Sequence, residues 1–171
     1  TQTGLDQFEM VGLDACLMGH VEVLSALAPH ARYAVVSQET EPALGWAYTS
    51  FLQALLQNPD ADGAALSRTI VDSYIEEDQR IVDDQARAEF LRQGSPLGGF
   101  FGGFAQASPE QLAPQMGAGS TLTAVDLSAL PGLLDSLNEL AYVLQGSDQR
   151  AVARARTYAL SFTSVFGQQV P

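Results

Sequence analysis

The stretch Phe8-Glu-Met-Val-Gly-Leu-Asp-Ala-Cys-Leu-Met-Gly19 decides the fold class of this chain. Its first six residues, Phe8–Leu13, form a short and mainly apolar run between Asp6 and Asp14. Such a run is typical of a buried strand. A helix is predicted to follow at once, from about Leu17 to Ala28, because apolar residues recur at helical spacing until Pro29. A buried strand that leads directly into a helix indicates an α/β sheet.

The same alternation continues along the chain. Two more strands are predicted over Tyr33–Ser37 and Thr121–Leu127. Further helices are predicted at Thr49–Gln57, Ala61–Glu77 (capped by Asp60 or Asp62), Leu133–Leu144 and Asp148 to about Phe162. This order favours a parallel sheet with helices on its faces in a single domain. Because only three strands are predicted, we expect the sheet to need strands from outside this chain.

Residues 79–119 differ in character from the rest. They hold four glycines around three phenylalanines between Gly98 and Phe104, followed by Pro109 and Pro114. Glycine and proline oppose long regular elements, so we expect an insertion with one short helix near Asp83–Leu91 and then a mobile loop. Such a loop could serve as a substrate lid, as a partner contact, or only as a flexible surface segment.

Composition narrows the function classes. The chain has 171 residues, a net charge of −12 and 46% hydrophobic residues, which is enough for a packed core. The acidic charge disfavours nucleic acid and either attracts cationic ligands or only maintains solubility. No run of about 18 apolar residues predicts a membrane span, and no leader pattern is visible. The single cysteine, Cys16, excludes a disulfide framework within the chain.

Cys16 is the residue with the clearest chemical potential. It follows the first predicted strand, and ligands of parallel α/β sheets bind at the carboxyl ends of strands. The helix predicted to begin there would stabilise a thiolate, and its free N–H groups would stabilise an oxyanion. The other interpretation is a structural cysteine without chemistry.

Three motifs resemble the clostripain-like cysteine peptidases. Gly12–Gly19 with Val21-Glu22 resembles their nucleophile motif, and Thr121–Leu127 resembles a later strand. Between them, Ser37-Gln-Glu-Thr-Glu-Pro42 and Gly45-Trp46-Ala-Tyr48 resemble the loop that follows the second strand. The resemblance implies a caspase-like α/β sandwich with a mostly parallel sheet, of which residues 1–171 would be an incomplete part of one domain. It also implies an endopeptidase that uses Cys16 in a Cys/His dyad and cuts after Arg or Lys.

The histidine of that dyad is not found in this sequence. In the family it lies upstream of the cysteine and is followed by glycine, whereas Cys16 here has only fifteen residues before it. His20, expected on the same helix as Cys16, and His30, in a turn, do not fit the role. Either a separately processed light chain carries the histidine, or it belongs to an upstream segment of a longer protein.

The resemblance also implies substrate-binding residues. Asp14 would line the pocket for the residue before the cleaved bond, although it could instead cap the predicted helix. Relatives often carry a second pocket aspartate where this chain has Leu44, which weakens the expected preference for basic residues. Glu39 and Glu41 could supply the charge instead. Trp46 would either form a pocket wall or anchor the loop to the core.

Cofactors, partners and location follow from the same resemblance. The chemistry needs no metal; calcium is weakly supported by Glu76-Glu77-Asp78 and Asp83-Asp84, which lack the spacing of a calcium loop. The expected partners are a peptide or protein substrate and the segment carrying the histidine. Arg80, Arg87 and Arg92 are candidate self-cleavage points. Secretion or the cell envelope is favoured as location. The alternative function is a catalytically inactive, peptidase-like binding scaffold.

Overall fold

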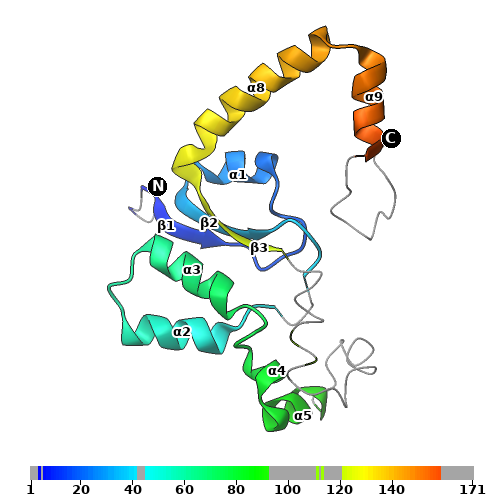
Figure 1. The fold of residues 1–171 in the computed structure, drawn as a ribbon. Helices are drawn as coiled ribbons and strands as arrows, with labels where there is room; N and C mark the ends of the chain where they lie inside the picture. The colour runs from blue at the N-terminus through cyan, green and yellow to red at the C-terminus, as the bar shows by residue number, and fades with distance from the viewer. Residues whose placement is uncertain are drawn as a thin grey trace.

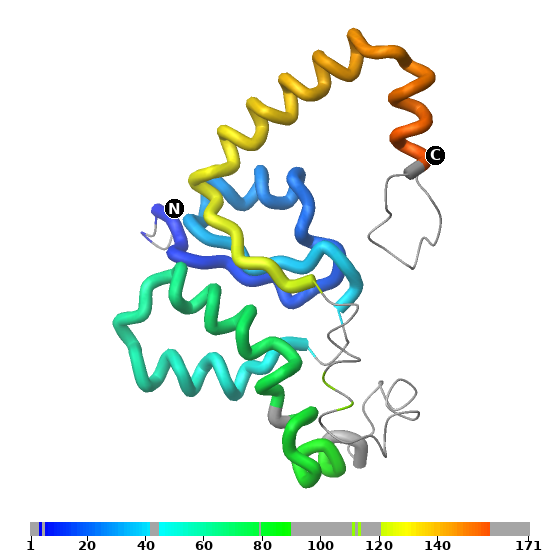
Figure 2. The backbone as a smooth tube through the Cα atoms, viewed as in Figure 1, coloured from blue at the N-terminus to red at the C-terminus, as the bar shows by residue number. Residues whose placement is uncertain are grey.

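The computed structural model describes Gly4 and residues 6–41, 45–92, 111, 113 and 121–158 of the 171-residue chain. Its strands are β1 Phe8–Gly12, β2 Ala31–Ser37 and β3 Leu122–Asp126. Its helices are α1 Val21–Leu27, α2 Tyr48–Gln57, α3 Gly63–Ser73, α4 Gln79–Val82, α5 Asp84–Arg92, the 3-10 helix η1 Leu127–Ala129, α8 Leu130–Gly146 and α9 Gln149–Tyr158. The strands form one sheet flanked by helices, so the predicted α/β class is confirmed (Figures 1 and 2).

The sheet has the order β1-β2-β3 and is mixed. β1 and β2 are parallel, with Gly12 beside Val35. β2 and β3 are antiparallel, with Ser37 beside Leu122, so β3 departs from the parallel direction that the order of the elements favours. The direction of β3 follows from where the chain re-enters the sheet: Thr121 hydrogen-bonds to residues 37–39 at the end of β2, so β3 has to run back along it.

β2 forms the centre of the core because both of its faces are buried. Val35 points to one face, where it packs with Trp46, Phe51 and Ile70 from the 45–48 segment, α2 and α3. Ala34 and Val36 point to the other face, which is covered by α1 and η1. Side chains of a strand alternate between faces, so a strand covered on both sides has a continuous apolar run. Burial of each large aliphatic side chain contributes about 2 kcal/mol to this core.

The residues after Cys16 do not form the helix predicted for them. α1 begins only at Val21, and Leu17 has a positive φ of 62°. The N–H of Leu17 donates to the Glu39 carbonyl at 3.1 Å, and that of Gly19 donates to the Ser37 carbonyl at 2.7 Å. A Cβ at residue 19 would lie 2.9 Å from the Gln38 nitrogen, so only glycine permits this approach. These long-range backbone bonds replace the first turn of the predicted helix.

The remaining predicted helices are present with shifted ends. α3 starts at Gly63. Asp62, one of the two predicted caps, caps this helix, because its side chain accepts a hydrogen bond from the N–H of Ala65 at 2.8 Å. In the insertion, α5 corresponds to the predicted short helix, and α4 precedes it. The glycine- and phenylalanine-rich part of the insertion lies outside the described residues, and so does the loop predicted there.

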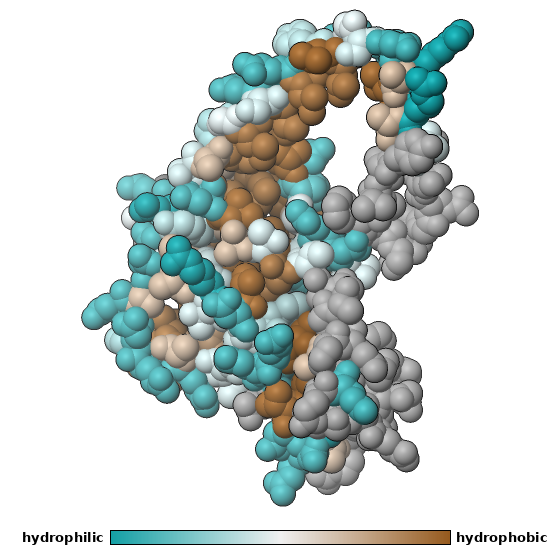
Figure 3. Space-filling view, viewed as in Figure 1, coloured by the Kyte–Doolittle hydropathy of each residue, from teal (hydrophilic) through white to brown (hydrophobic). Residues whose placement is uncertain are grey.

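α8 and α9 together form an arm, Leu130–Tyr158, that extends away from the sheet (Figure 1). Its base is anchored, because Leu130 is buried with the α1 cluster. Beyond the base, apolar side chains of α8 gather in an exposed stripe that Figure 3 shows in brown. The exposed large apolar residues of α8 are Leu133, Leu134, Leu137, Leu140, Tyr142, Val143 and Leu144. No described helix is both long and apolar enough to cross a bilayer.

Candidate active site

Cys16 lies in the turn between β1 and α1, at the end of β1 where the parallel strands terminate. The residue is exposed, and its Sγ accepts a hydrogen bond from the N–H of Glu41 at 3.2 Å. As a thiol it can also donate to the Glu41 carbonyl at 3.8 Å. The N–H of Cys16 itself makes no hydrogen bond with a described residue. The sulfur is therefore accessible and positioned by a backbone amide, not by the helix terminus that was predicted.

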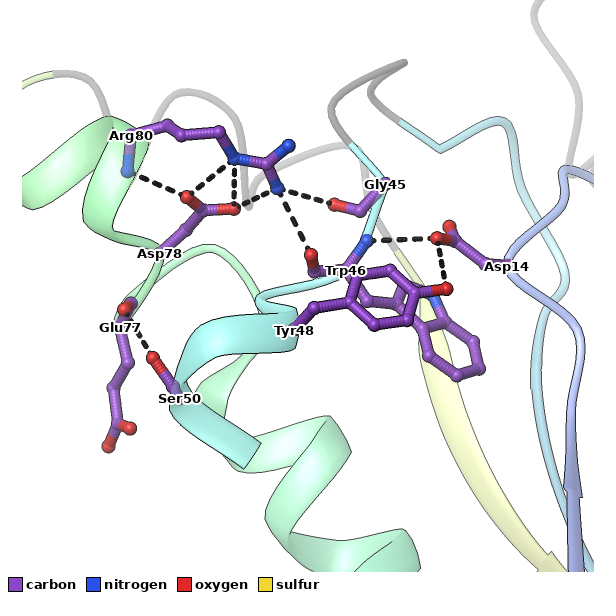
Figure 4. A network of polar contacts seen from close by, with 8 residues as sticks. All are labelled: Asp14, Gly45, Trp46, Tyr48, Ser50, Glu77, Asp78 and Arg80. Atoms are coloured by element: carbon purple, nitrogen blue, oxygen red, sulfur yellow. Dashed lines mark hydrogen bonds and ion pairs between the residues drawn. The ribbon is translucent and has the colours of Figure 1, made fainter. Parts of the chain in front are cut away.

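Asp14 binds the segment that leads into α2. Its Oδ2 accepts hydrogen bonds from the N–H of Trp46 at 3.1 Å and from the Tyr48 hydroxyl at 3.0 Å (Figure 4). The alternative that Asp14 caps the helix after Cys16 is wrong, because His20 is the N-cap of α1. Burial, and then the neighbouring Asp14 carboxylate, raises the pKa of Tyr48. Asp14 thus fixes the 45–48 segment, while its Oδ1 accepts no hydrogen bond from a described residue.

Trp46 anchors this segment to the core. It is 4% exposed and packs against Val35 and Phe51, and its ring lies so close to Gly12 that a Cβ there would be 2.6 Å from Cζ3. The ring also stacks on Tyr48, with centroids 6.5 Å apart. Trp46 and Tyr48 line a cavity of about 200 Å³ together with Ser50, Asp78 and Arg80. Trp46 thus anchors the segment in the core; neither Cys16 nor Asp14 lines this cavity, so a substrate-pocket wall at Trp46 stays a prediction.

Arg80 holds the 45–48 segment from the opposite side. Its Nη2 donates to the Trp46 carbonyl at 3.0 Å and to the Gly45 carbonyl at 3.5 Å, while Asp78 accepts from the same guanidinium (Figure 4). Arg87 is buried and bonded to the Ile81 carbonyl and to Asp84. Arg80 and Arg87 thus lie within helices α4 and α5 with bonded side chains, and their role as self-cleavage points stays a prediction; the side chain of Arg92 is not described.

Glu41 lies beside Asp14 and Cys16. Both of its carboxyl oxygens are buried and have no hydrogen-bond partner among the described residues. The pKa of Glu41 is raised to about 7, first by burial and next by the charge of Asp14. The side chains of Trp46 and Ser37 lower this pKa. The carboxyl groups of Glu41 and Asp14 therefore lie near each other, and the Glu41 backbone contacts the thiol.

Glu39 contributes to the site through its backbone. Its N–H donates to the Thr121 hydroxyl at 2.8 Å, and its carbonyl accepts from Leu17. Its carboxylate makes no hydrogen bond or ion pair with a described residue. Of the predicted site residues, the structure brings together Cys16, Asp14 and Trp46, whereas the Glu39 side chain stays apart from their contacts.

Neither histidine is paired with Cys16. His20 is the N-cap of α1, not a member of the same helix as Cys16, and its Nδ1 lies 2.9 Å from Glu22 Oε2. His30 lies at the opposite end of the sheet, where its carbonyl accepts from the first residue of β1, Phe8. No described histidine therefore contacts the thiol. The described part of the chain also contains no group of three or more His, Cys, Asp and Glu side chains arranged to hold a metal ion.

The sequence analysis missed three residues that shape the site: Tyr48, Arg80 and Thr121. Thr121 Oγ1 accepts from the N–H groups of Gln38 at 3.1 Å and Glu39 at 2.8 Å. Tyr48 and Thr121 were quoted only as motif members, and Arg80 only as a cleavage point. All three residues bond to residues that are distant in the sequence. The only sequence feature that could have indicated these contacts was a polar residue at or beside the end of a predicted element.

An accessible thiol at the carboxyl end of a strand, held by a backbone amide, is the arrangement expected of an α/β fold that carries a cysteine nucleophile. Comparison with known proteins narrows the class: a model of the clostripain family matches residues 2–169, so the chain belongs to that family. The resemblance predicted from the motifs is confirmed.

Two solved structures are similar to the chain. A structure titled "B. fragilis cysteine protease" is 24% identical, with a TM-score of 0.46, and the match covers 77% of this chain and 42% of that one. A clostripain from Bacteroides thetaiotaomicron in complex with the peptide inhibitor BTN-VLTK-AOMK is 28% identical, with a TM-score of 0.33, covering 40% and 30%. The chain thus spans less than half the length of these proteins. None of the curated proteins matches it.

Proposed function

We propose that this chain carries the nucleophile of a cysteine endopeptidase. The observation that supports this most directly is the exposed Cys16 sulfur, held by the N–H of Glu41 at the carboxyl end of β1, in a member of the clostripain family. The amide that donates to the sulfur holds it in place, and the thiolate is the attacking form of cysteine. Exposure leaves the sulfur open to a peptide carbonyl.

The proposed reaction is acyl transfer through a covalent intermediate. The Cys16 thiolate attacks the carbonyl carbon of the substrate, and the unpaired N–H of Cys16 donates to the oxyanion that forms. A histidine protonates the departing amine, and then activates the water that releases the acid product and restores the thiol. Since neither His20 nor His30 pairs with Cys16, this histidine comes from a segment outside the chain. The chemistry itself requires no metal ion.

Substrate preference is assigned to Asp14. Its Oδ2 is engaged by Trp46 and Tyr48, which orients the carboxylate and leaves Oδ1 open to a ligand. A fixed carboxylate beside the nucleophile favours an arginine or lysine side chain before the cleaved bond, through a charge-assisted hydrogen bond. The net charge of −12 would increase the encounter rate of cationic peptides.

The test uses the full-length protein and a fluorogenic arginyl peptide. Replacing Cys16 with Ala should lower kcat/KM by at least about a thousandfold, because the covalent route is lost. The melting temperature should not change, since Cys16 is exposed. An arginyl chloromethyl ketone should alkylate Cys16 in the native protein, as detected by peptide mass mapping. Ser136→Ala on α8 is the matched control.

Hydrolysis that persists in the Cys16→Ala variant would contradict the proposal. If the intact protein shows neither hydrolysis nor alkylation but still binds the arginyl peptide, the chain is the inactive binding scaffold considered above.

A further inference from the structure

We propose that Arg80 is a positioning residue of this site, which holds the Asp14 carboxylate in its orientation through the backbone of Gly45 and Trp46. Because Arg80 acts through these groups and not on the substrate, it is not a catalytic residue. The inference rests on the proposed function, since it concerns how the substrate-binding carboxylate two residues before Cys16 is held.

A continuous series of hydrogen bonds joins Arg80 to Asp14 (Figure 4). Nη2 of Arg80 donates to the Trp46 carbonyl at 3.0 Å and, over a longer distance of 3.5 Å, to the Gly45 carbonyl. The N–H of Trp46 belongs to the same peptide group as the Gly45 carbonyl, and it donates to Asp14 Oδ2 at 3.1 Å. A peptide group is planar, so a guanidinium that restrains its carbonyl also restrains the direction of its N–H. The position of Arg80 therefore determines where this N–H meets the carboxylate.

The guanidinium is itself fixed by a buried carboxylate. Asp78, which is 3% exposed, accepts from Arg80 Nε at 2.9 Å and from the backbone N–H of Arg80 at 2.8 Å. Asp78 lies between α3 and α4, and Ile75 and Ile81 on either side of it are buried in the same core cluster as Trp46. A buried charge that loses its partner is costly, so Asp78 keeps the guanidinium in one orientation. The turn between α3 and α4 thus provides a rigid base for the contacts to Trp46.

Asp14 depends on the 45–48 segment for its orientation. Both hydrogen bonds to its Oδ2 come from this segment, one from the Trp46 N–H and one from the Tyr48 hydroxyl at 3.0 Å. Gly45 has a positive φ of 70°, and a Cβ there would lie 2.7 Å from Asp14 Oδ2, so the backbone passes directly against the carboxylate. Burial of the Trp46 ring fixes the side chain of this segment, whereas Arg80 fixes its peptide groups. Without the guanidinium, rotation of these peptide groups would turn the N–H away from Asp14.

The first test compares Arg80→Met with the native protein, both at full length. The ratio of kcat/KM for an arginyl substrate to kcat/KM for a citrullinyl substrate isolates the effect of the carboxylate, because the two side chains have the same shape and differ in charge. This ratio should fall about tenfold in Arg80→Met, mainly through a higher KM for the arginyl substrate. Arg68→Met on α3, where the arginine is exposed, is the matched control and should keep the native ratio.

Arg80→Lys tests the geometry of the clamp. One ammonium group can reach a carbonyl but cannot bind two carbonyls and Asp78 as the planar guanidinium does, so the ratio should fall only about threefold. If Arg80→Met does not fold, the comparison rests on Arg80→Lys, and a native ratio in that variant overturns the inference.

A double-mutant cycle determines whether Arg80 acts through Asp14. In Asp14→Asn the ratio should already be low, and the addition of Arg80→Met should lower it by less than about twofold further. If Arg80 contributed only to the stability of the fold, Arg80→Met would lower the melting temperature and leave the ratio of the folded protein at its native value. Losses that multiply in the double variant would mean that Arg80 acts by another route, and would also overturn the inference.

Alkylation of Cys16 gives a readout that needs no turnover. The rate with an arginyl chloromethyl ketone is divided by the rate with iodoacetamide, which lacks the basic side chain. This division cancels any change in the reactivity of the thiol itself. The quotient should fall about tenfold in Arg80→Met, as the ratio for the substrates does.

The outcomes separate the two proposals. If the native protein is neither active nor alkylated, or if Asp14→Asn leaves the ratio unchanged, the proposed function fails. If Asp14→Asn lowers the ratio and Arg80→Met does not, the proposed function stands, and Arg80 serves only the fold.

Discussion

The surroundings of Cys16 and the α8–α9 arm start from the same sheet but are built in opposite ways. Near Cys16, exposed polar groups are positioned by buried ones: Asp14 binds the segment that Trp46, only 4% exposed, anchors in the core. On α8, apolar side chains are themselves exposed, with Leu140 51% and Val143 64% accessible. The site therefore depends on core packing for its geometry, whereas the arm contributes little packing to the described structure.

The largest expected contrast is between a buried and an exposed aliphatic residue. Ile70 on α3 is 2% exposed beneath Trp46, so Ile70→Ala should lower the free energy of unfolding by about 3 kcal/mol through lost burial and a cavity. Leu140→Ala on α8 should change it by less than about 0.5 kcal/mol. Urea unfolding followed by circular dichroism measures both. Equal losses would mean that α8 is buried in the protein, and the comparison would then break down.

A smaller contrast involves one glycine from each region. In Gly12→Ala the new Cβ would lie 2.6 Å from the Trp46 ring, so the ring must shift, at a cost of about 2 kcal/mol. Gly132 on α8 has no neighbouring atom within 4 Å of a new Cβ, so Gly132→Ala should stabilise the helix by about 0.5 kcal/mol. The same unfolding measurement applies. We expect the free energy of unfolding to fall in Gly12→Ala and to rise in Gly132→Ala. If Gly12→Ala left this free energy unchanged, the Trp46 ring would be loosely packed.

The smallest expected effect is the dependence of stability on pH. Folding raises the pKa of Glu41 from 4.5 to about 7, so the folded state binds the proton more tightly than the unfolded state. Stability due to this group should therefore be greatest below pH 4.5 and should decline as pH rises to about 7. After allowance for solvent screening, the decline is about 1 kcal/mol. Glu41→Gln should remove this decline in stability with pH, whereas Glu139→Gln on α8 should leave it in place. If the stability of Glu41→Gln declined with pH as in the native protein, another group would cause the decline.

Local sequence patterns predicted the elements whose structure depends on local burial. The apolar run of β2 and the periodicity of α2 and α3 identify them correctly, because their faces pack on the same core. The apolar spacing after Cys16 gave a wrong helix start, because the amides of Leu17 and Gly19 bond to residues 37–39. Gly19, unfavourable inside a helix, was the available warning.

The candidate site was predictable only in part. Cys16 and Asp14 could be chosen from the motif, and Trp46 could be assigned to the core or to a wall. The burial of the Glu41 carboxyl and the contacts made by Arg80 and Thr121 depend on segments distant in sequence. Neither residue type nor spacing encodes those contacts; they arise when β3 enters the sheet beside the end of β2.

The anchoring of Thr121 beside residues 37–39 has a practical consequence for protein engineering. Arg92 ends α5 and Thr121 precedes β3, so the linker between them joins two attachment points that the rest of the fold defines. Closing a flexible linker of twice the length costs only about 0.6 kcal/mol more. Because Ala113 packs against the core cluster of Trp46, a reporter peptide or an affinity tag inserted between α5 and Ala113 is expected to leave the thiol and its neighbours in their arrangement.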